Sequence, residues 1–271
     1  MISLTKDKAM LGYELLSTYP NIACFVTTRK GGFSSGTYGT FNCSPFSGDE
    51  AENIRSNQTK LCSSLPQTPH ELIIPFQTHG NQVCFVDQNF LAKDAQARQE
   101  LLCGVDAVVT NEKGYCLCVS TADCVPILLY DPKKQVIAAV HAGWRGTLQA
   151  ILSGMLQQMK EKYGIEGGDI LACIGPSISL ESFEVGEEVY EAFQQKGYDM
   201  KRISRWNDEA QKHHLDLWEA NRMQLLNFGV PDQQIQLAGI CTYINHLEFF
   251  SARRLGIQSG RILSGIMLLD Q

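Results

Sequence analysis

The chain has 271 residues, an apolar share of 44% and a formal net charge of −6. This charge argues against a surface that binds nucleic acid or an anionic membrane, and the apolar runs are too short to cross a bilayer. The N-terminal sequence MISLTKDKAM has no apolar core of signal-peptide length. We therefore expect a cytoplasmic protein whose ten cysteines are free thiols.

Alternating and continuous apolar runs predict several strands in the first half of the chain. The predicted strands span residues 22–28, 72–76, 83–87, 106–110 and 115–120. A capping Asp and loosely helical spacing predict a helix over 49–65. The segment 88–102 is polar with weak helical spacing, and we expect it to lie outside the core.

Two apolar runs, 125–130 and 135–140, flank the polar sequence Asp131-Pro132-Lys133-Lys134. Asp and Pro in these positions favour a type I turn, which predicts a hairpin. If the hairpin is centred on Pro132 and Lys133, residue i faces residue 265 − i, and Cys124 faces His141. Both faces of the hairpin are apolar, as expected for strands that are covered on both sides.

The second half of the chain contains the clearest helical patterns. Apolar residues at helical spacing, with Thr147 as cap and Gly164 as stop, predict a long helix. Further helices are predicted over 184–196 and 216–228, and further strands over 169–174, 236–241 and 262–269. Strands outnumber helices without strict alternation, which favours an α+β fold with central sheets and outer helices.

His79, Cys124 and His141 are the candidate chemical residues because each lies at the end of an apolar segment. The other histidines are expected at the surface: His70, His213, His214 and His246. Two imidazoles and a thiol could hold a metal ion with an open position for water. A metal-free pair of Cys124 and His141 with an activated thiol remains an alternative, as does a buried cysteine beside a hydrogen-bonded histidine.

Arginines in turns flanked by Gly or Ser indicate an anion site, because a planar guanidinium suits phosphate or carboxylate. They are Arg29, Arg145, Arg253, Arg254 and Arg261. Any one of them could instead be a surface ion-pair residue.

Together these stretches resemble the YfiH-type laccase-domain family, which is also called the polyphenol oxidase family or peptidoglycan editing factor. The resemblance extends from about Thr28 to Arg261 in family order. It rests on Thr28-Arg29-x-Gly31-Gly32-x-Ser34 with Asn42, Gln77-x-His79-Gly80, Asp106-Ala107, Thr121-Ala122-Asp123-Cys124-x-Pro126-Ile127, His141-Ala142-Gly143-Trp144-Arg145-Gly146, Ile174-Gly175-Pro176 and Phe249-Phe250-Ser251-x-Arg253-Arg254.

The resemblance implies a single domain over 1–271, an αββα sandwich of two mixed β-sheets with outer helices. It implies that His79, Cys124 and His141 bind Zn²⁺, or alternatively Cu²⁺, or act as a cysteine-hydrolase-like dyad. It implies phosphorolysis of adenosine, inosine, guanosine or methylthioadenosine, and adenosine deamination. We expect Arg29, Asn42, Arg145 and Arg253 to bind the nucleoside and phosphate, with Arg29 and Arg253 supplying the phosphate contacts.

A zinc-assisted nucleoside enzyme, expected to be a monomer, fits these features best. A multicopper laccase fits poorly because such oxidases use paired His-x-His motifs, whereas this chain has six histidines and no such pair. Two alternatives stay open. One is a Cys–His hydrolase or amidase that acts on peptidoglycan precursors, and the other is a metal-binding module without catalytic activity.

Overall fold

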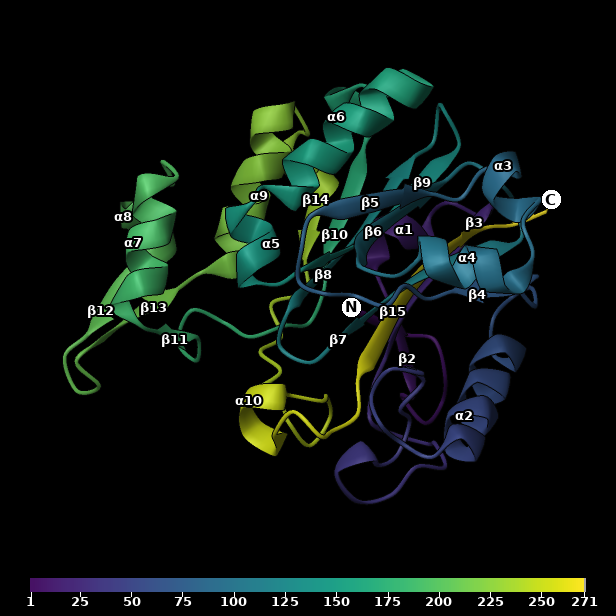
Figure 1. The fold of residues 1–271 in the computed structure, drawn as a ribbon, viewed down its shortest axis with the longest axis horizontal. Coiled ribbons are helices and arrows are strands. Elements are labelled where there is room, and N and C mark those ends of the chain that lie inside the picture. The colour runs from purple at the N-terminus through teal and green to yellow at the C-terminus, as the bar shows by residue number, and fades with distance from the viewer. Residues whose placement is uncertain (271) are drawn as a thin grey trace.

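Two mixed β-sheets lie face to face in the computed structural model, which describes residues 1–270 (Figure 1). The first sheet has the strand order β1 (Ile2–Ser3), β2 (Met10–Gly12), β3 (Ile22–Thr27), β15 (Ile262–Leu268), β7 (Tyr115–Thr121) and β4 (Glu71–Ile73). The second has the order β14 (Ile235–Leu237), β10 (Leu171–Ile174), β8 (Val125–Asp131), β9 (Val136–Ala142), β6 (Val105–Thr110) and β5 (Gln82–Phe85). Each sheet contains both parallel and antiparallel pairs.

Helices cover the outer faces of both sheets, which confirms the predicted αββα arrangement. The second sheet is covered by α5 (Trp144–Leu148), α6 (Ile151–Tyr163) and α9 (Leu217–Phe228), whereas α2 (Ala51–Ser63) covers the first (Figure 1). Four further helices are short: α1 (Glu14–Ser17), α3 (Gln88–Leu91), α4 (Ala95–Leu101) and α10 (Ala252–Leu255). No helix within residues 1–270 combines the length and apolar character that a bilayer crossing requires.

The core has three layers because side chains alternate along the buried strands. In β15, Ile262 and Ile266 join the cluster between the two sheets, while Leu263 and Met267 join the cluster that includes Leu61 of α2. In β8, Leu128 faces the first sheet, and its neighbours Ile127 and Leu129 pack with the residues of α6 and α9. This burial on both faces matches the double apolar pattern of the hairpin sequence.

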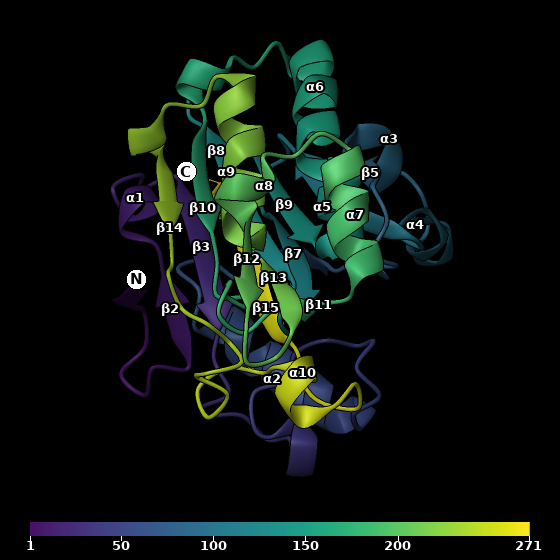
Figure 2. The same ribbon diagram turned by 90° about the vertical axis from the view of Figure 1, so that its left-hand side faces the viewer.

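A third, small sheet forms a projecting lobe that the sequence patterns did not predict. Its strands β11 (Glu184–Val185), β13 (Lys212–Leu215) and β12 (Ser204–Asn207) lie beside α7 (Glu187–Gln195) and α8 (Met200–Ile203) (Figure 2). The helix predicted from Glu184 therefore starts later, because Glu184 and Val185 pair with the neighbouring strand. His214 of β13 is only 5% exposed and its Nδ1 lies 2.9 Å from the Leu180 carbonyl oxygen, so its predicted surface position is wrong.

Two other predictions require correction. The long helix predicted from Thr147 to Gly164 is divided into α5 and α6, because Ala150 adopts the left-handed region with φ of 57°. The segment 88–102 is not wholly outside the core: Phe90 and Leu102 are buried in the cluster between the sheets. The Asp87 and Asp94 carboxylates cap α3 and α4 there, which explains how so polar a segment forms helices.

Candidate functional site

His79, Cys124 and His141 come together at one end of the two sheets. Their ligand atoms all lie within 4.8 Å of one another, with His79 exposed, Cys124 half-buried and His141 buried. Within residues 1–270 they form the one group of three or more His, Cys, Asp or Glu residues close enough to share a metal ion. The structure thus brings together the three residues selected from the sequence.

The route by which Cys124 meets His141 differs from the predicted register. His141 pairs with Pro126, and Asp131 pairs with Val136. The observed register of the hairpin is therefore shifted by two residues relative to the predicted register. The cause is a longer turn, in which Asp131 Oδ1 accepts hydrogen bonds from the main-chain N–H groups of Lys133 and Lys134. An even offset leaves side chains on the same face of a sheet, which is why Cys124 and His141 still meet.

Two of the three residues lie where the chain crosses from the first sheet to the second. His79 lies between β4 and β5, and Cys124 lies between β7 and β8. Both crossings contain a residue in the left-handed region: His79 itself has φ of 63°, and Asp123 has φ of 88°. Such backbone is costly for residues other than Gly and is held by its surroundings, often at functional sites. The Asp123 carboxylate accepts hydrogen bonds from Thr242 Oγ1 and the Arg253 main-chain N–H, both at 2.7 Å.

Asp106 supports two of the metal-ligand candidates from the interior. Its Oδ1 lies 2.7 Å from His141 Nδ1 and accepts the His79 main-chain N–H at 3.0 Å, while its Oδ2 accepts the Gly80 N–H at 2.7 Å. Burial would raise the pKa of this carboxyl, but the His141 contacts and the main-chain donors outweigh it and lower the pKa. Since the carboxylate is an acceptor, Nδ1 of His141 carries the proton and Nε2 remains for a metal ion.

Cys124 and His141 shift each other's pKa in the direction of a thiolate–imidazolium pair. Burial opposes both charges, but the attraction to His141 and contacts with both histidines lower the pKa of Cys124 to about 6. Burial likewise opposes the imidazolium, yet Cys124 and Asp106 raise the pKa of His141 to about 9. A thiolate at neutral pH is the form of cysteine that binds metal or acts as nucleophile.

This donor set fits a single metal ion. Two imidazoles and a thiolate suit Zn²⁺ or Cu²⁺, and three protein ligands leave a position open for water or substrate. Asp106 provides the carboxylate behind a metal-binding histidine that such centres commonly have.

A cavity of about 410 Å³ opens above the three residues. Its aromatic rim contains Phe46 and Phe76, which are 40% and 45% exposed and meet edge to face with ring centroids 5.2 Å apart. The same cavity is lined by Thr121 and Arg261. Its size suits a small organic molecule with an aromatic part.

The four residues predicted to bind substrate do not line this cavity. The Arg29 guanidinium donates to the carbonyls of Gly39 and His246, and the Arg253 guanidinium donates to the carbonyl of Glu184. Arg145 is exposed and lies over the Trp144 ring. Asn42 is buried, with its Oδ1 accepting the main-chain N–H of Arg261 at 3.0 Å. Their roles in binding nucleoside or phosphate stay predictions.

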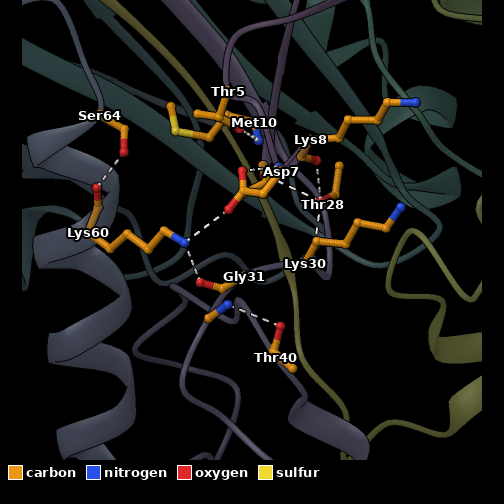
Figure 3. A network of polar contacts seen from close by, with 12 residues as sticks. Thr5, Asp7, Lys8, Met10, Thr28, Lys30, Gly31, Thr40, Lys60 and Ser64 are labelled. Atoms are coloured by element: carbon orange, nitrogen blue, oxygen red, sulfur yellow. Dashed lines mark hydrogen bonds and ion pairs between the residues drawn. The ribbon is translucent and has the colours of Figure 1, made fainter.

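A polar network fixes the loop that contains Arg29 (Figure 3). Lys60 of α2 donates both to the Asp7 carboxylate, at 3.1 Å, and to the Gly31 carbonyl. Gly32 has no room for a side chain, because a Cβ there would lie 2.2 Å from the Thr40 carbonyl oxygen. Gly32 therefore permits close contact between parts of the protein's own backbone.

Sequence reasoning assigned no role in the site to Asp106 or Thr121. The sequence did contain a signal for Asp106, because it is a charged residue in an otherwise apolar strand, and a buried charge needs partners. Thr121 had none, since a Thr at a strand end has no distinguishing pattern.

Residues 23–269 match the family described as multi-copper polyphenol oxidoreductase laccase. The chain belongs to this laccase family. The purine nucleoside phosphorylase of Bacteroides thetaiotaomicron is 63% identical over 268 residues, covering 99% of both chains. The protein named adenosine deaminase RL5, from an unknown prokaryotic organism, is 39% identical over 253 residues, covering 93% of this chain and 96% of its own.

Solved structures of two other proteins share the fold. The Bacillus licheniformis protein YfiH aligns with a TM-score of 0.87 at 28% identity, covering 96% of each chain. YlmD from Geobacillus stearothermophilus aligns with a TM-score of 0.84 at 29% identity, covering 93% of each chain. The resemblance inferred from sequence motifs is thereby confirmed.

Proposed function

We propose that this chain is a metal-dependent purine nucleoside enzyme. It would cleave adenosine, inosine, guanosine or methylthioadenosine with phosphate and would also deaminate adenosine. The observation that supports this most directly is the meeting of His79, Cys124 and His141 at the base of a cavity of nucleoside-like size. The names of the two relatives, a phosphorylase and a deaminase, agree with both activities.

His79, Cys124 and His141 would hold the ion, with Zn²⁺ preferred and Cu²⁺ the alternative. When bound, such an ion supplies a Lewis acid and lowers the pKa of water. Asp106 keeps the His141 proton on Nδ1 and so fixes the orientation of the ring. Phe46 and Phe76 offer the purine ring an aromatic surface at the rim, where stacked or edge-to-face contacts are favourable.

Phosphorolysis requires that phosphate be held beside the sugar. An oxygen of hydrogen phosphate forms a bond to C1′ while the bond from C1′ to the base nitrogen breaks. The bonding electron pair leaves with the base, which takes the phosphate proton, so the products are the purine and ribose 1-phosphate. A nearby cationic group that orients phosphate would favour this reaction over attack by water.

The test is a panel of nucleosides assayed with and without phosphate on protein of measured metal content. We expect release of adenine and ribose 1-phosphate from adenosine only when phosphate is present, together with inosine from deamination. Adenine release that did not depend on phosphate would overturn the phosphorylase assignment and favour a hydrolase.

A second candidate is a cysteine hydrolase or amidase that acts on peptidoglycan precursors. It is favoured by the chain of contacts from Asp106 through His141 to Cys124, which is the arrangement of a nucleophile, its base and the group that orients the base. Removal of metal by a chelator distinguishes the two candidates. A cysteine hydrolase would keep or gain activity, whereas the nucleoside enzyme would lose it.

Copper-dependent polyphenol oxidation and a purely metal-binding role are less well supported. A multicopper oxidase needs several metal centres, and the described residues offer one group of three ligands. A non-catalytic module has no need of a cavity above the metal ligands. The cytoplasmic location and the monomeric state stay predictions.

A further inference from the structure

Arg261 is a cation without a carboxylate partner in the cavity that contains His79, Cys124 and His141. Its Nη1 donates to the carbonyls of Ser259 and Gly260 at 2.6 and 3.0 Å, and its Nη2 donates to the Ile257 carbonyl at 2.9 Å. These acceptors are all neutral, and none of the ion pairs among residues 1–270 includes Arg261. Cys124 and Asp123 act electrostatically on Arg261 from nearby, but neither forms an ion pair or hydrogen bond with it. A half-buried guanidinium whose hydrogen-bond partners are all neutral can still bind an anion.

The guanidinium keeps donors free on its remaining edge. Of its five N–H groups, the two on Nη1 and one on Nη2 are used by the three carbonyls. Among the described residues, Nε and the second Nη2 hydrogen have no acceptor. Unused N–H donors on a guanidinium suit the recognition of an oxyanion.

Thr121 provides an independent sign of a missing ligand. Thr121 is 1% exposed and lines the same cavity, yet its Oγ1 has no hydrogen-bond partner within residues 1–270. A buried hydroxyl without a partner is unfavourable, so such groups usually bind water or a ligand. Thr121 pairs with Ile262 across the β7–β15 ladder, Ile262 directly follows Arg261 in the chain, and both Thr121 and Arg261 line the cavity.

From this geometry we infer that Arg261 and Thr121 form an oxyanion subsite that holds inorganic phosphate beside the metal-ligand cluster. This inference rests on the proposed phosphorolysis and identifies the residues that hold its second substrate. Cys124 follows Thr121 by three residues, so these two residues lie at the two ends of the connection between β7 and β8. Asn42 becomes a positioning residue, because its side chain fixes the main chain of Arg261.

The first measurement is the affinity of zinc-loaded protein for inorganic phosphate, by calorimetry, alongside the KM for phosphate in adenosine cleavage. Arg261→Gln should weaken both by about tenfold or more, the scale of one charged hydrogen bond. The phosphate affinity of Arg261→Lys should lie between those of this variant and the wild type, because lysine keeps the positive charge but lacks the planar, two-pronged guanidinium. Deamination of adenosine uses no phosphate and should change less.

Thr121→Val gives a second test that does not disturb the loop around Arg261. It removes a hydroxyl that has no partner, so the fold should be retained while phosphate affinity falls by about tenfold, the scale of one hydrogen bond to a charged acceptor. Ser264→Ala is the matched control, since Ser264 is also buried with an unpartnered hydroxyl but does not line the cavity. Arg254→Gln is the control for Arg261, because Arg254 is exposed and lies outside the cavity.

The outcomes separate this inference from the function on which it rests. If the wild type cleaves adenosine in a phosphate-dependent manner but Arg261→Gln and Thr121→Val bind phosphate as the wild type does, the subsite lies elsewhere. If the wild type shows neither phosphate binding nor phosphate-dependent cleavage, the proposed phosphorolysis fails as well. Should Arg261→Gln not fold, the comparison of Thr121→Val with Ser264→Ala decides.

Discussion

Asp106 is the residue on which the orientation of the metal-ligand candidates depends. It accepts a hydrogen bond from the His141 ring and from main-chain N–H groups of the His79 loop. In Asp106→Asn, an amide NH₂ would replace one of these acceptor oxygens and face an N–H donor. Zinc affinity should therefore fall by about 10- to 100-fold, the usual effect of losing such a supporting group.

Competition with a chelator measures this change in zinc affinity. Asp131→Asn is the matched control, because Asp131 is equally buried and also accepts main-chain N–H groups, but at the far end of β8. Equal zinc affinity in Asp106→Asn and the wild type would show that Asp106 does not orient the ligands.

The thiolate character of Cys124 predicts how alkylation of the metal-free protein depends on pH. Because the pKa of Cys124 is lowered to about 6, the reactive thiolate should be present above that pH and lost as the pH falls through it. The rate of iodoacetamide modification should therefore rise to a plateau near neutral pH, below the range in which an ordinary thiol ionises. Cys124→Ser should lack this fast phase, and a midpoint near that of an ordinary thiol would contradict the ion pair.

At the scale of elements, the sequence predicted which segments form the site better than how they join. Strand patterns placed Cys124 and His141 correctly at strand ends, because burial on both faces dictates continuous apolar runs. His79 lies in the connection after β4, which ends earlier than predicted, at Ile73. The predicted hairpin register was wrong by two residues, because hydrogen bonds to the Asp131 side chain set the turn length. Such hydrogen bonds cannot be predicted from the apolar pattern of the strands. The division between α5 and α6 was missed because Ala150 is an ordinary helix former.

The junction between α5 and α6 makes a prediction about stability. Ala150 holds a left-handed conformation that costs an L-residue about 1–2 kcal/mol. Ala150→Gly removes this cost but increases the entropy of the unfolded chain by about 0.4–1 kcal/mol. The free energy of unfolding should therefore rise by about 1 kcal/mol or less.

Gln149→Gly is the adjacent control for this substitution. Gln149 has a negative φ of −80°, so glycine there has no strain to relieve and should lower stability. Urea denaturation of both variants provides the measurement. A loss of stability in Ala150→Gly equal to that in Gln149→Gly would show that the left-handed residue is not strained.

At the scale of the whole molecule, the candidate site lies where the chain passes from one sheet to the other. The segments that contain His79 and Cys124 each connect a strand of the first sheet to a strand of the second, and Arg261 directly precedes the central strand β15. This arrangement explains why the candidate site required the fold. Residues 79, 124, 141 and 261 are distant in sequence, and only the sandwich topology determines which of several loop arginines enters the cavity with them.

A metal ion bound to these segments should therefore stabilise the whole sandwich. A ligand that binds only the folded state adds about 2.7 kcal/mol at a free concentration 100 times its Kd. We expect the Tm of the metal-stripped wild type to rise with added zinc, and that of Cys124→Ala to rise far less. Cys124→Ala should also retain the fold while losing most of its bound zinc, because Cys124 precedes β8 and is outside the strand ladder.

Differential scanning calorimetry across a zinc titration, paired with elemental analysis, gives both quantities for each protein. His70→Ala is the control, since His70 is exposed and is not one of the clustered ligands. It should respond to zinc as the wild type does. Undiminished zinc in Cys124→Ala, or an equal rise of Tm in that variant, would place the metal at other residues and remove the basis for a zinc-dependent reaction in this cavity.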